Sequence, residues 1–299
     1  MDITYSFVSS STQTKSIQQA IDNISLQGGS LRFLPGTYKT GTLHMRSHVT
    51  IVLEKGAVIQ GSEYIEDYPV DTGRKEEGTN GEYMSFSRLI FFDGVENAGI
   101  RGEGTIHGNG KLIRQKGRAA NLIRVQNSRN IHIENVQLRD SAGWNTHILY
   151  SKDIFIRDVT IINDLSNRNT DGVDIDSSCN VYVDGCYMYC GDDCVVVKTT
   201  RNSDLLRAVE HVRVTNNVFF TLKAAQKIGT ESFADIRDVR FGNNTVLFAD
   251  RAIGVYNCDG GNFEDIHFVN TSIVKAREEV EIQSKERFGK GKIKQILII

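Results

Sequence analysis

Three aspartates near the middle of the chain have a spacing that acid–base chemistry could use. Asp171 lies in the segment NTDG, and Asp192 and Asp193 lie in CGDDC, 21 and 22 residues further along. A glycine beside each site lets the backbone turn tightly. If the fold brings the two segments together, the three carboxylates push one another's pKa values apart, so that one keeps a proton while its neighbours stay ionised. A general acid and a general base require that division.

The amino-acid composition limits the classes of protein to which this chain can belong. The chain has 299 residues, 39% of them hydrophobic and 24% charged, which is ordinary for a globular protein with a sizeable core. Its net charge is −2 with no long run of one sign, so neither a nucleic acid nor a membrane surface is expected as a partner. The N-terminus lacks the features of a signal peptide. The location is therefore open: cytoplasmic, or secreted or periplasmic if a signal was removed.

A repeated phrase predicts the fold. An apolar-x-apolar triplet, followed five residues after its last member by another apolar residue, recurs with first positions 23 to 31 residues apart. These positions are Ile131, Ile154, Val181, Val212, Val239 and Ile266, and the phrase begins again at Ile296. A period in the twenties made of β-branched strands indicates a solenoid. We predict one all-β domain over residues 1–299, a right-handed single-stranded parallel β-helix with three strands per coil.

An amphipathic helix and the two ends complete the prediction. Residues 14–24 place isoleucines at helical spacing, so a capping helix is expected at the N-terminal end. Residues 292–299 start a new coil and then stop, so the C-terminal coils are expected to be incomplete, through truncation or because the protein is short. Turn residues recur near one place in several phrases and are expected to stack from coil to coil: Asn135, Asp158, Asp184, Asn216 and Asn243.

This architecture gives the aspartate spacing a geometric meaning. Residues one coil apart in a β-helix lie about 4.8 Å apart. Asp171 therefore faces the Asp192–Asp193 pair across adjacent coils. Consecutive residues of a regular strand point to opposite faces, so both members of the pair face outward only where Gly191 opens a turn or bulge. Such a group suits hydrolysis of a glycosidic bond with inversion, which needs an acid for the leaving oxygen and a base for water.

At these residues the chain resembles glycoside hydrolase family 28, the polygalacturonase-like β-helix enzymes. The resemblance rests on Asn169-Thr170-Asp171, on Gly191-Asp192-Asp193 and on much of the chain, including LRFLPGTYKTGTLHMRSHVTIVLEKGAVIQGS and IRGEGTIHGNGK. It implies that Asp192 is the general acid and that Asp171 and Asp193 activate water. It also implies that Asn169 positions a carboxylate or a sugar hydroxyl, that the substrate is a pectin-like polysaccharide or oligosaccharide, and that neither a cofactor nor a metal is used.

Two motifs of the family are missing. Its Gly-His-Gly should fall near residues 223–225, where the sequence is Lys-Ala-Ala, and its Arg-Ile-Lys should fall in residues 253–256, Ile-Gly-Val-Tyr. The usual clamp for a uronate carboxylate is therefore absent. Positive charge from Lys223, Lys227 or Arg251 is the possible replacement, and the alternative for each is a solvated surface charge.

Four further residues are candidates for contacting substrate, two of them with an alternative. Lys198 ends the second motif. Tyr256 offers an aromatic platform for a sugar. Glu231 either contacts substrate or is a surface carboxylate. Trp144 either lines the groove or is buried.

Other polar residues have simpler interpretations. Asp174 and Asp176 share one face of a strand but lack the rest of a calcium loop, so outward-facing strand positions are favoured over a metal site. His147 is expected to be structural. The five cysteines fit neither a zinc site nor a disulfide framework, so reduced and mostly buried thiols are expected: Cys179, Cys186, Cys190, Cys194 and Cys258.

Three hypotheses for function follow. The first is an inverting glycosidase acting on an α-linked, pectin-like polysaccharide, which the three aspartates favour. The second is a weak or inactive β-helix that binds carbohydrate, which the missing motifs favour. The third is a calcium-dependent lyase with an Arg or Lys base. Endo or exo action, the sugar and the oligomeric state are left open by the sequence.

Overall fold

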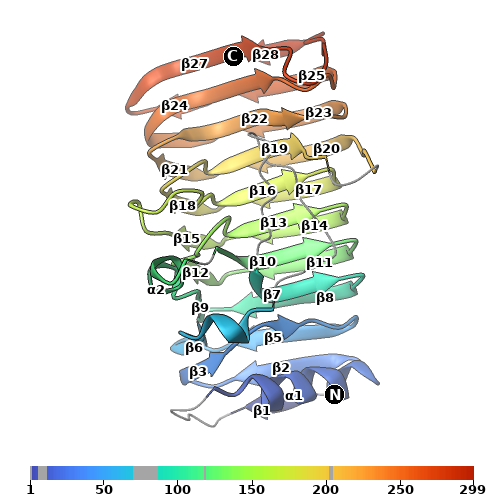
Figure 1. Cartoon of the computed structure of the whole chain (residues 1–299), viewed down its shortest axis with the longest axis vertical. Helices are drawn as coiled ribbons and strands as arrows, with labels where there is room; N and C mark the ends of the chain where they lie inside the picture. The colour runs from blue at the N-terminus through green and yellow to red at the C-terminus, as the bar shows by residue number, and fades with distance from the viewer. Residues whose placement is uncertain (1, 6–11, 70–86, 118, 202–204) are drawn as a thin grey trace.

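The computed structural model describes residues 2–5, 12–69, 87–117, 119–201 and 205–299, and these form a parallel β-helix. Three stacks of parallel strands run along its length (Figure 1). The first stack contains β1 (Asp2–Tyr5), β2 (Gly29–Phe33), β5 (Val49–Leu53), β8 (Glu96–Gly102), β11 (Arg129–Glu134), β14 (Lys152–Arg157), β17 (Cys179–Asp184), β20 (Val209–Thr215), β23 (Ile236–Gly242), β25 (Phe263–Val269) and β28 (Ile296–Ile298).

The second and third stacks share β24 (Thr245–Asn257), a long strand that bends from one into the other. The rest of the second stack is β3 (Gly36–Thr40), β6 (Ala57–Gly61), β9 (Thr105–His107), β12 (Gln137–Arg139), β15 (Thr160–Ile162), β18 (Tyr187–Cys190), β21 (Val218–Thr221) and β26 (Ser272–Ile273). The rest of the third is β4 (Leu43–His44), β7 (Ser87–Asp93), β10 (Ala120–Gln126), β13 (Thr146–Leu149), β16 (Val173–Asp176), β19 (Val195–Thr199), β22 (Ala224–Ser232) and β27 (Ala276–Ser284).

The repeat predicted from the sequence is the strand register of the first stack. Ile131 pairs with Ile154, Ile154 with Val181, and the series continues without a shift to Ile266 and Ile296. Nearly all members of the series are fully buried and belong to one continuous core. Because each coil buries its apolar face only against its neighbours, the repeat produces a solenoid. The predicted fold class is therefore confirmed.

A helix closes the N-terminal end. Helix α1 (Thr14–Ser25) buries Ile17, Ile21 and Ile24 completely, and it packs against β2. The prediction of a helix at 14–24 is thus confirmed. Two further helical segments, the 3₁₀ turn η1 (Ile65–Asp67) and the short helix α2 (Gly110–Gln115), lie in loops. Among the residues that the structure describes, no helix has the length and apolar character to cross a bilayer.

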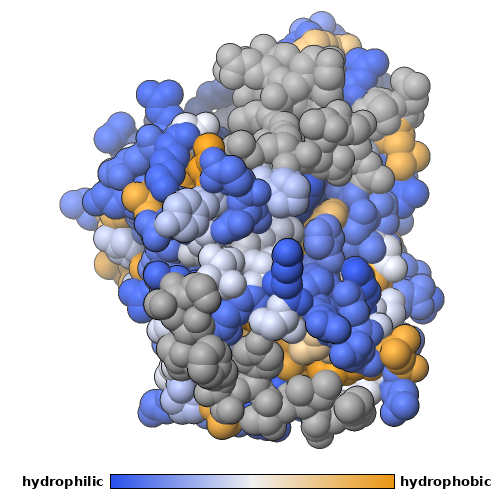
Figure 2. Space-filling view, turned by 60° about the horizontal axis from the view of Figure 1, so that its bottom comes forward, coloured by the Kyte–Doolittle hydropathy of each residue, from blue (hydrophilic) through white to orange (hydrophobic). Residues whose placement is uncertain are grey.

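Polar residues shape the turns and the surface. Four of the five predicted turn residues have positive φ, and Asn216 donates to Asp184 Oδ1 on the neighbouring coil (2.7 Å), so stacking of turn residues is seen there. Viewed with the N-terminal end turned forward, the surface is mostly hydrophilic, with scattered apolar patches (Figure 2). All five cysteines are free thiols, four of them buried and Cys179 half-buried.

The third stack differs from a simple two-faced sheet. Every residue of β10, β13, β16 and β19 is buried, so polar side chains on the outward face of these strands are shielded from solvent. Parallel strands are commonly covered on both faces. Here the covered outward face carries charged residues, and these form the surroundings of the aspartates.

Candidate active site

The three aspartates lie in irregular segments that stack on adjacent coils. Asp171 precedes β16, and Asp192 and Asp193 lie in a bend between β18 and β19. Strands β16 and β19 pair in register, and the N–H of Gly172 extends this pairing by donating to the carbonyl of Asp193 (2.8 Å). One carboxylate oxygen from each aspartate lies within 4.8 Å of the others. The structure therefore brings the three predicted side chains together, with the consecutive pair outside any regular strand.

Two glycines make this approach possible. A Cβ at Gly191 would lie 2.5 Å from Thr170 Oγ1 and 2.9 Å from two carbonyl oxygens of the preceding coil. A Cβ at Gly172 would lie 2.4 Å from the carbonyl oxygen of Cys194. Neither glycine has positive φ, so close packing of the two loops, rather than an unusual backbone conformation, requires glycine at both positions.

Asp192 has the environment of a general acid. Its two oxygens accept the backbone N–H groups of Asn169 and Asp193, each at 3.1 Å. These bonds favour the charged form, but burial and the neighbouring charge of Asp193 outweigh them and raise the pKa of Asp192 to about 6. Asp192 therefore holds a proton in weakly acidic solution, and it is the most exposed of the three aspartates.

Asp193 and Asp171 have contrasting surroundings. Lys227 Nζ lies 2.6 Å from Asp193 Oδ2, and the N–H of Ala224 donates to Asp193 Oδ1 (3.0 Å), so a charged side chain contacts one oxygen of Asp193 and a backbone donor contacts the other. Asp171 Oδ1 is buried without a hydrogen-bond partner. Burial, followed by the charges of Asp174 and Asp192, raises the pKa of Asp171 well above its ordinary value. The site thus combines proton-holding carboxyl groups with one paired carboxylate.

Replacing Lys227 with glutamine is expected to affect rate and pH dependence together. The charge of Lys227 lowers the pKa of Asp192, so its removal raises that pKa and moves the alkaline limit of activity to higher pH. Losing the ion pair with Asp193 is expected to lower kcat about 10- to 100-fold. Rates measured across pH test both effects. Lys223→Gln is the matched comparison, because Lys223 also lowers the pKa of Asp192 but more weakly; an equal shift in both variants would contradict the assignment.

A buried ion pair lies beneath the aspartates. Lys198 is 3% exposed, and its Nζ lies 2.6 Å from Asp174 Oδ1 and 3.4 Å from the ring centroid of Trp144. Burial would lower the pKa of Lys198, but Asp174, Glu231 and Asp171 outweigh it and raise that pKa. Lys198 therefore remains charged below the cluster and partly offsets its negative charge.

Asp176, whose strand position pairs with that of Lys198, is a second buried carboxylate with several hydrogen-bond partners. Asp176 accepts from Ser177 Oγ and from the N–H of Thr200, both at 2.9 Å, and His147 Nε2 lies 3.3 Å from its other oxygen. Burial raises the pKa of Asp176, but its contacts with His147 outweigh this and lower it. The structural role expected for His147 is confirmed. Asp174 and Asp176 alternate with the core residue Ile175 and so face outward as expected, but both side chains are fully buried.

The residues at the expected uronate clamp form a closed contact. The hydroxyl of Tyr256 donates to Glu281 Oε2 (2.5 Å), and Arg251 Nε lies 2.5 Å from the same oxygen. A Cβ at Gly254 would lie 2.7 Å from the ring of Tyr256, so the glycine makes room for the aromatic ring. Tyr256 is only 8% exposed, and Arg251 is paired with Glu281. At the position expected for a uronate clamp, the cation Arg251 is therefore paired with Glu281 within the protein.

Comparison with known proteins places the chain in a family. The family model for glycosyl hydrolases family 28 matches residues 39–295. The chain belongs to glycosyl hydrolase family 28. A probable polygalacturonase of Vitis vinifera is 35% identical over 203 residues, covering 62% of this chain and 41% of the relative. An endo-polygalacturonase of Pectobacterium carotovorum is 29% identical over 249 residues, covering 75% and 59%.

Solved structures agree on the fold. A family 28 exopolygalacturonase of Yersinia enterocolitica superposes with a TM-score of 0.81 at 21% identity, covering 96% of this chain and 62% of that one. An exopolygalacturonase of Thermotoga maritima gives 0.77 at 21% identity, covering 91% and 72%. The chain spans 41% of the length of the Vitis vinifera relative and 59% of the length of the Pectobacterium carotovorum relative.

The structure places the other predicted substrate-binding residues in different surroundings. Asn169 is half-buried, has φ 54°, and supplies the N–H that holds Asp192, so its backbone positions a carboxylate. Trp144 is 7% exposed with Lys198 against its ring, which fits the alternative of burial and not a sugar-stacking surface. Glu231 is 8% exposed and raises the pKa values of Lys198 and Lys227, so the alternative of a surface carboxylate is wrong.

Sequence reasoning missed Glu281 and the pairing of Asp174 with Lys198. The signal for the second was present, because Asp174 and Asp176 alternate along a strand one coil before Lys198. Glu281 lies three coils beyond Lys198 in a segment without a recognisable motif, so no pattern pointed to it.

Proposed function

We propose that this protein hydrolyses an α-linked, pectin-like polysaccharide or oligosaccharide. The observation that carries the proposal is the convergence of three carboxylates in unlike environments, with Asp193 against Lys227 and Asp192 at a pKa of about 6. The polygalacturonase names of its relatives supply the substrate class. Asp192 protonates the leaving glycosidic oxygen, and Asp193 takes a proton from the attacking water. Asp171, whose Oδ1 is unpartnered, orients that water.

The stereochemical course is part of the proposal. We favour inversion, in which water attacks directly and no glycosyl-enzyme bond forms. One oxygen of each carboxylate lies within 4.8 Å of the others, and this closest approach is shorter than the roughly 6.5–9.5 Å between the carboxyl groups of inverting pairs and near the roughly 5 Å of retaining pairs. Retention through a covalent intermediate is therefore the competing course. Proton NMR of the first product formed distinguishes the two, because inversion of an α-linkage releases the β-anomer.

Product release from a panel of plant and microbial polysaccharides tests the activity. Hydrolysis that persists in EDTA and is lost in Asp192→Asn supports the proposal, and the substrate that reacts identifies the sugar at the cleavage point. Unsaturated products that need calcium would instead indicate a lyase. Sugar binding that is retained without hydrolysis of any substrate would indicate a binding protein.

The pH dependence of the rate follows from Asp192. The raised pKa means that the acid form, which must donate the proton, is lost as pH rises through about 6. We therefore expect kcat to fall about tenfold per pH unit above that value. A pH–rate profile on the reactive polysaccharide checks this, and a plateau of kcat extending to pH 8 would contradict the assignment of Asp192 as the acid.

A further inference from the structure

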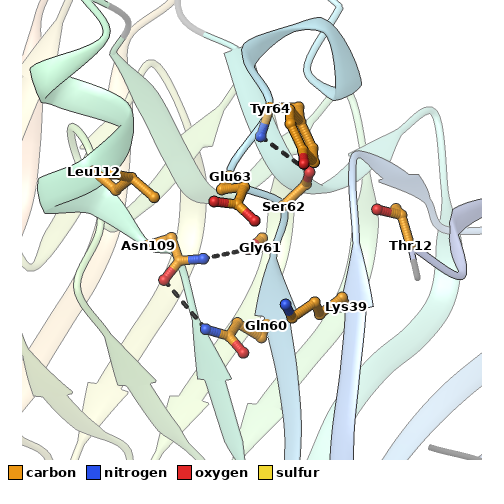
Figure 3. Close-up of a pocket in the computed structure, with 9 residues that line it drawn as sticks. All are labelled: Thr12, Lys39, Gln60, Gly61, Ser62, Glu63, Tyr64, Asn109 and Leu112. Carbon is orange, nitrogen blue, oxygen red and sulfur yellow. Dashed lines mark hydrogen bonds between the residues drawn. The ribbon is translucent and has the colours of Figure 1, made fainter. Parts of the chain in front are cut away.

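A polar pocket lies where the second-stack strands β6 and β9 end, N-terminal to the aspartates along the solenoid. The pocket has a volume of about 470 Å³, within the range of small-ligand sites. Figure 3 shows side chains converging on it from separate segments. They are Lys39 on β3, Gln60 on β6, Glu63 and Tyr64 after β6, and Asn109 and Leu112 at α2.

The pocket and the aspartates occupy equivalent positions in different coils. Gln60 and Asn109 follow or end strands of the second stack, as do Asp171 and Asp192 further along the chain. Strand β6 pairs with β9, β9 with β12 and β12 with β15. Three strand spacings, roughly 14 Å, therefore separate the pocket strand β6 from β15. One extended sugar chain lying along this edge can reach both places.

The lining suits a sugar. Asn109 Nδ2 donates to the carbonyl of Gly61 (2.6 Å), and Gln60 Nε2 donates to Asn109 Oδ1 (3.3 Å), so the two amides are held in place (Figure 3). Gln60 Oε1 remains available as an acceptor, and Glu63 adds carboxylate oxygens for hydroxyl groups. Tyr64 is 57% exposed and presents an aromatic surface, to whose ring centroid Lys116 Nζ approaches within 5.4 Å.

The pocket contains one cation, Lys39, together with the carboxylate of Glu63. Lys39 has no ion pair among the described residues and is half-buried, so it is an uncommitted cation within the pocket. Three cations of the catalytic centre, in contrast, are paired: Lys198 with Asp174, Lys227 with Asp193 and Arg251 with Glu281. The exposed Lys223, which lowers the pKa of Asp192, has no ion pair among the described residues.

Two arginines connect the pocket with the catalytic loop. Arg114 of α2 donates from Nη2 to the carbonyl of Arg168 (2.6 Å), and Arg168 directly precedes Asn169. Burial and then the charge of Arg168 lower the pKa of Arg114, so two positive charges lie close together. A polyanion passing along this edge relieves their repulsion.

We propose that this pocket binds a uronate residue of the same polysaccharide chain that is cleaved at Asp192. Lys39 binds its carboxylate, Gln60 and Asn109 bind its hydroxyl groups, and Arg114 and Arg168 bind carboxylates of the residues between. The inference rests on the proposed function. It assigns recognition of acidic groups to a site remote from the cleavage point, in place of a clamp beside it.

Binding to an uncleaving variant tests the proposal. Calorimetry with a digalacturonate and an octagalacturonate is carried out on the full chain carrying Asp192→Asn, with and without Lys39→Ala. Affinity for the octamer is expected to fall about tenfold on losing one charge-assisted contact, so that the Kd values of long and short chains converge. Lys55→Ala, which removes an exposed lysine from a different turn, is the matched control and is expected to leave both Kd values unchanged.

The outcomes separate the two proposals. If the octamer binds with equal affinity with and without Lys39→Ala, the distal site is disproved while the proposed function stands. If neither oligomer binds to the Asp192→Asn protein, the proposed function and the distal site both fail. Binding of a neutral galactose oligomer that depends on Gln60 but not on Lys39 would disprove an acidic ligand. Unfolding curves of each variant verify that the fold is intact.

Discussion

Replacing Asp192 with asparagine is expected to lower kcat by about 10² to 10⁴, the contribution of a positioned general acid. Asparagine preserves size, but its single carbonyl oxygen can accept only one of the two N–H groups, from Asn169 and Asp193, that the two oxygens of Asp192 accept. The variant therefore loses the transferable proton and one backbone hydrogen bond. The measurement is kcat on the reactive polysaccharide. Asp265→Asn is the control, because Asp265 lies on the first stack, away from the cluster, with φ 57°, a conformation that asparagine also tolerates.

The same variant is expected to be more stable than the parent at neutral pH. The pKa of Asp192 is raised from 3.8 to about 6, so the folded state holds this proton more tightly than the unfolded chain. Ionising the buried group above pH 6 therefore costs up to about 3 kcal/mol, and no cost applies below pH 4. Asparagine removes the cost. Urea unfolding should show a gain at pH 7 that disappears near pH 4, and a loss of stability at pH 7 would contradict the environment assigned to Asp192.

Replacing Lys198 with methionine is expected to destabilise the fold by about 3–5 kcal/mol. Methionine keeps the apolar stem of the side chain but leaves the fully buried Asp174 without its partner. Removing one member of a buried ion pair leaves an uncompensated charge, which is the reason for the large effect. The loss should grow as pH rises, because Asp174 then has to ionise unpaired. The midpoint and slope of urea unfolding measure the change.

A double variant isolates the pair. Asp174→Asn removes the charge that Lys198 neutralises, so adding it to Lys198→Met should restore part of the stability. The interaction free energy from the four proteins is then the contribution of the pair. If Lys198→Met costs the same in both backgrounds, packing against Trp144 and not the ion pair explains the loss.

The fold could be predicted from the sequence because the residues that repeat are the buried ones. Ile131 and its successors pair one with the next, so their spacing is the coil length itself. The convergence of Asp171 with Asp192 and Asp193 follows from the same fact, since Val173 and Val195 are 22 residues apart and pair directly.

The burial of the residues around the aspartates was harder to predict from the sequence. Alternation along β16 correctly predicts that Asp174 and Asp176 face outward, but it does not predict that both side chains are buried. Both faces of this part of the third stack are buried, and burial of the outer face depends on packing that the strand pattern does not encode. Trp144 was similarly ambiguous, because an aromatic ring in a loop has the same sequence signal whether it contacts a sugar or a lysine.

From β11 onward the coils vary in length by up to eight residues while the strands of the first stack stay in register, so the added residues go into turns and bulges elsewhere in the coil. A whole coil can therefore be inserted or deleted without reversing the orientation of the side chains in the first stack. Each such event between the Lys39 pocket and the aspartates changes their separation by one step of about 4.8 Å. If the proposed distal site and the proposed cleavage both hold, the number of intervening coils sets where along a bound polymer the bond is cut.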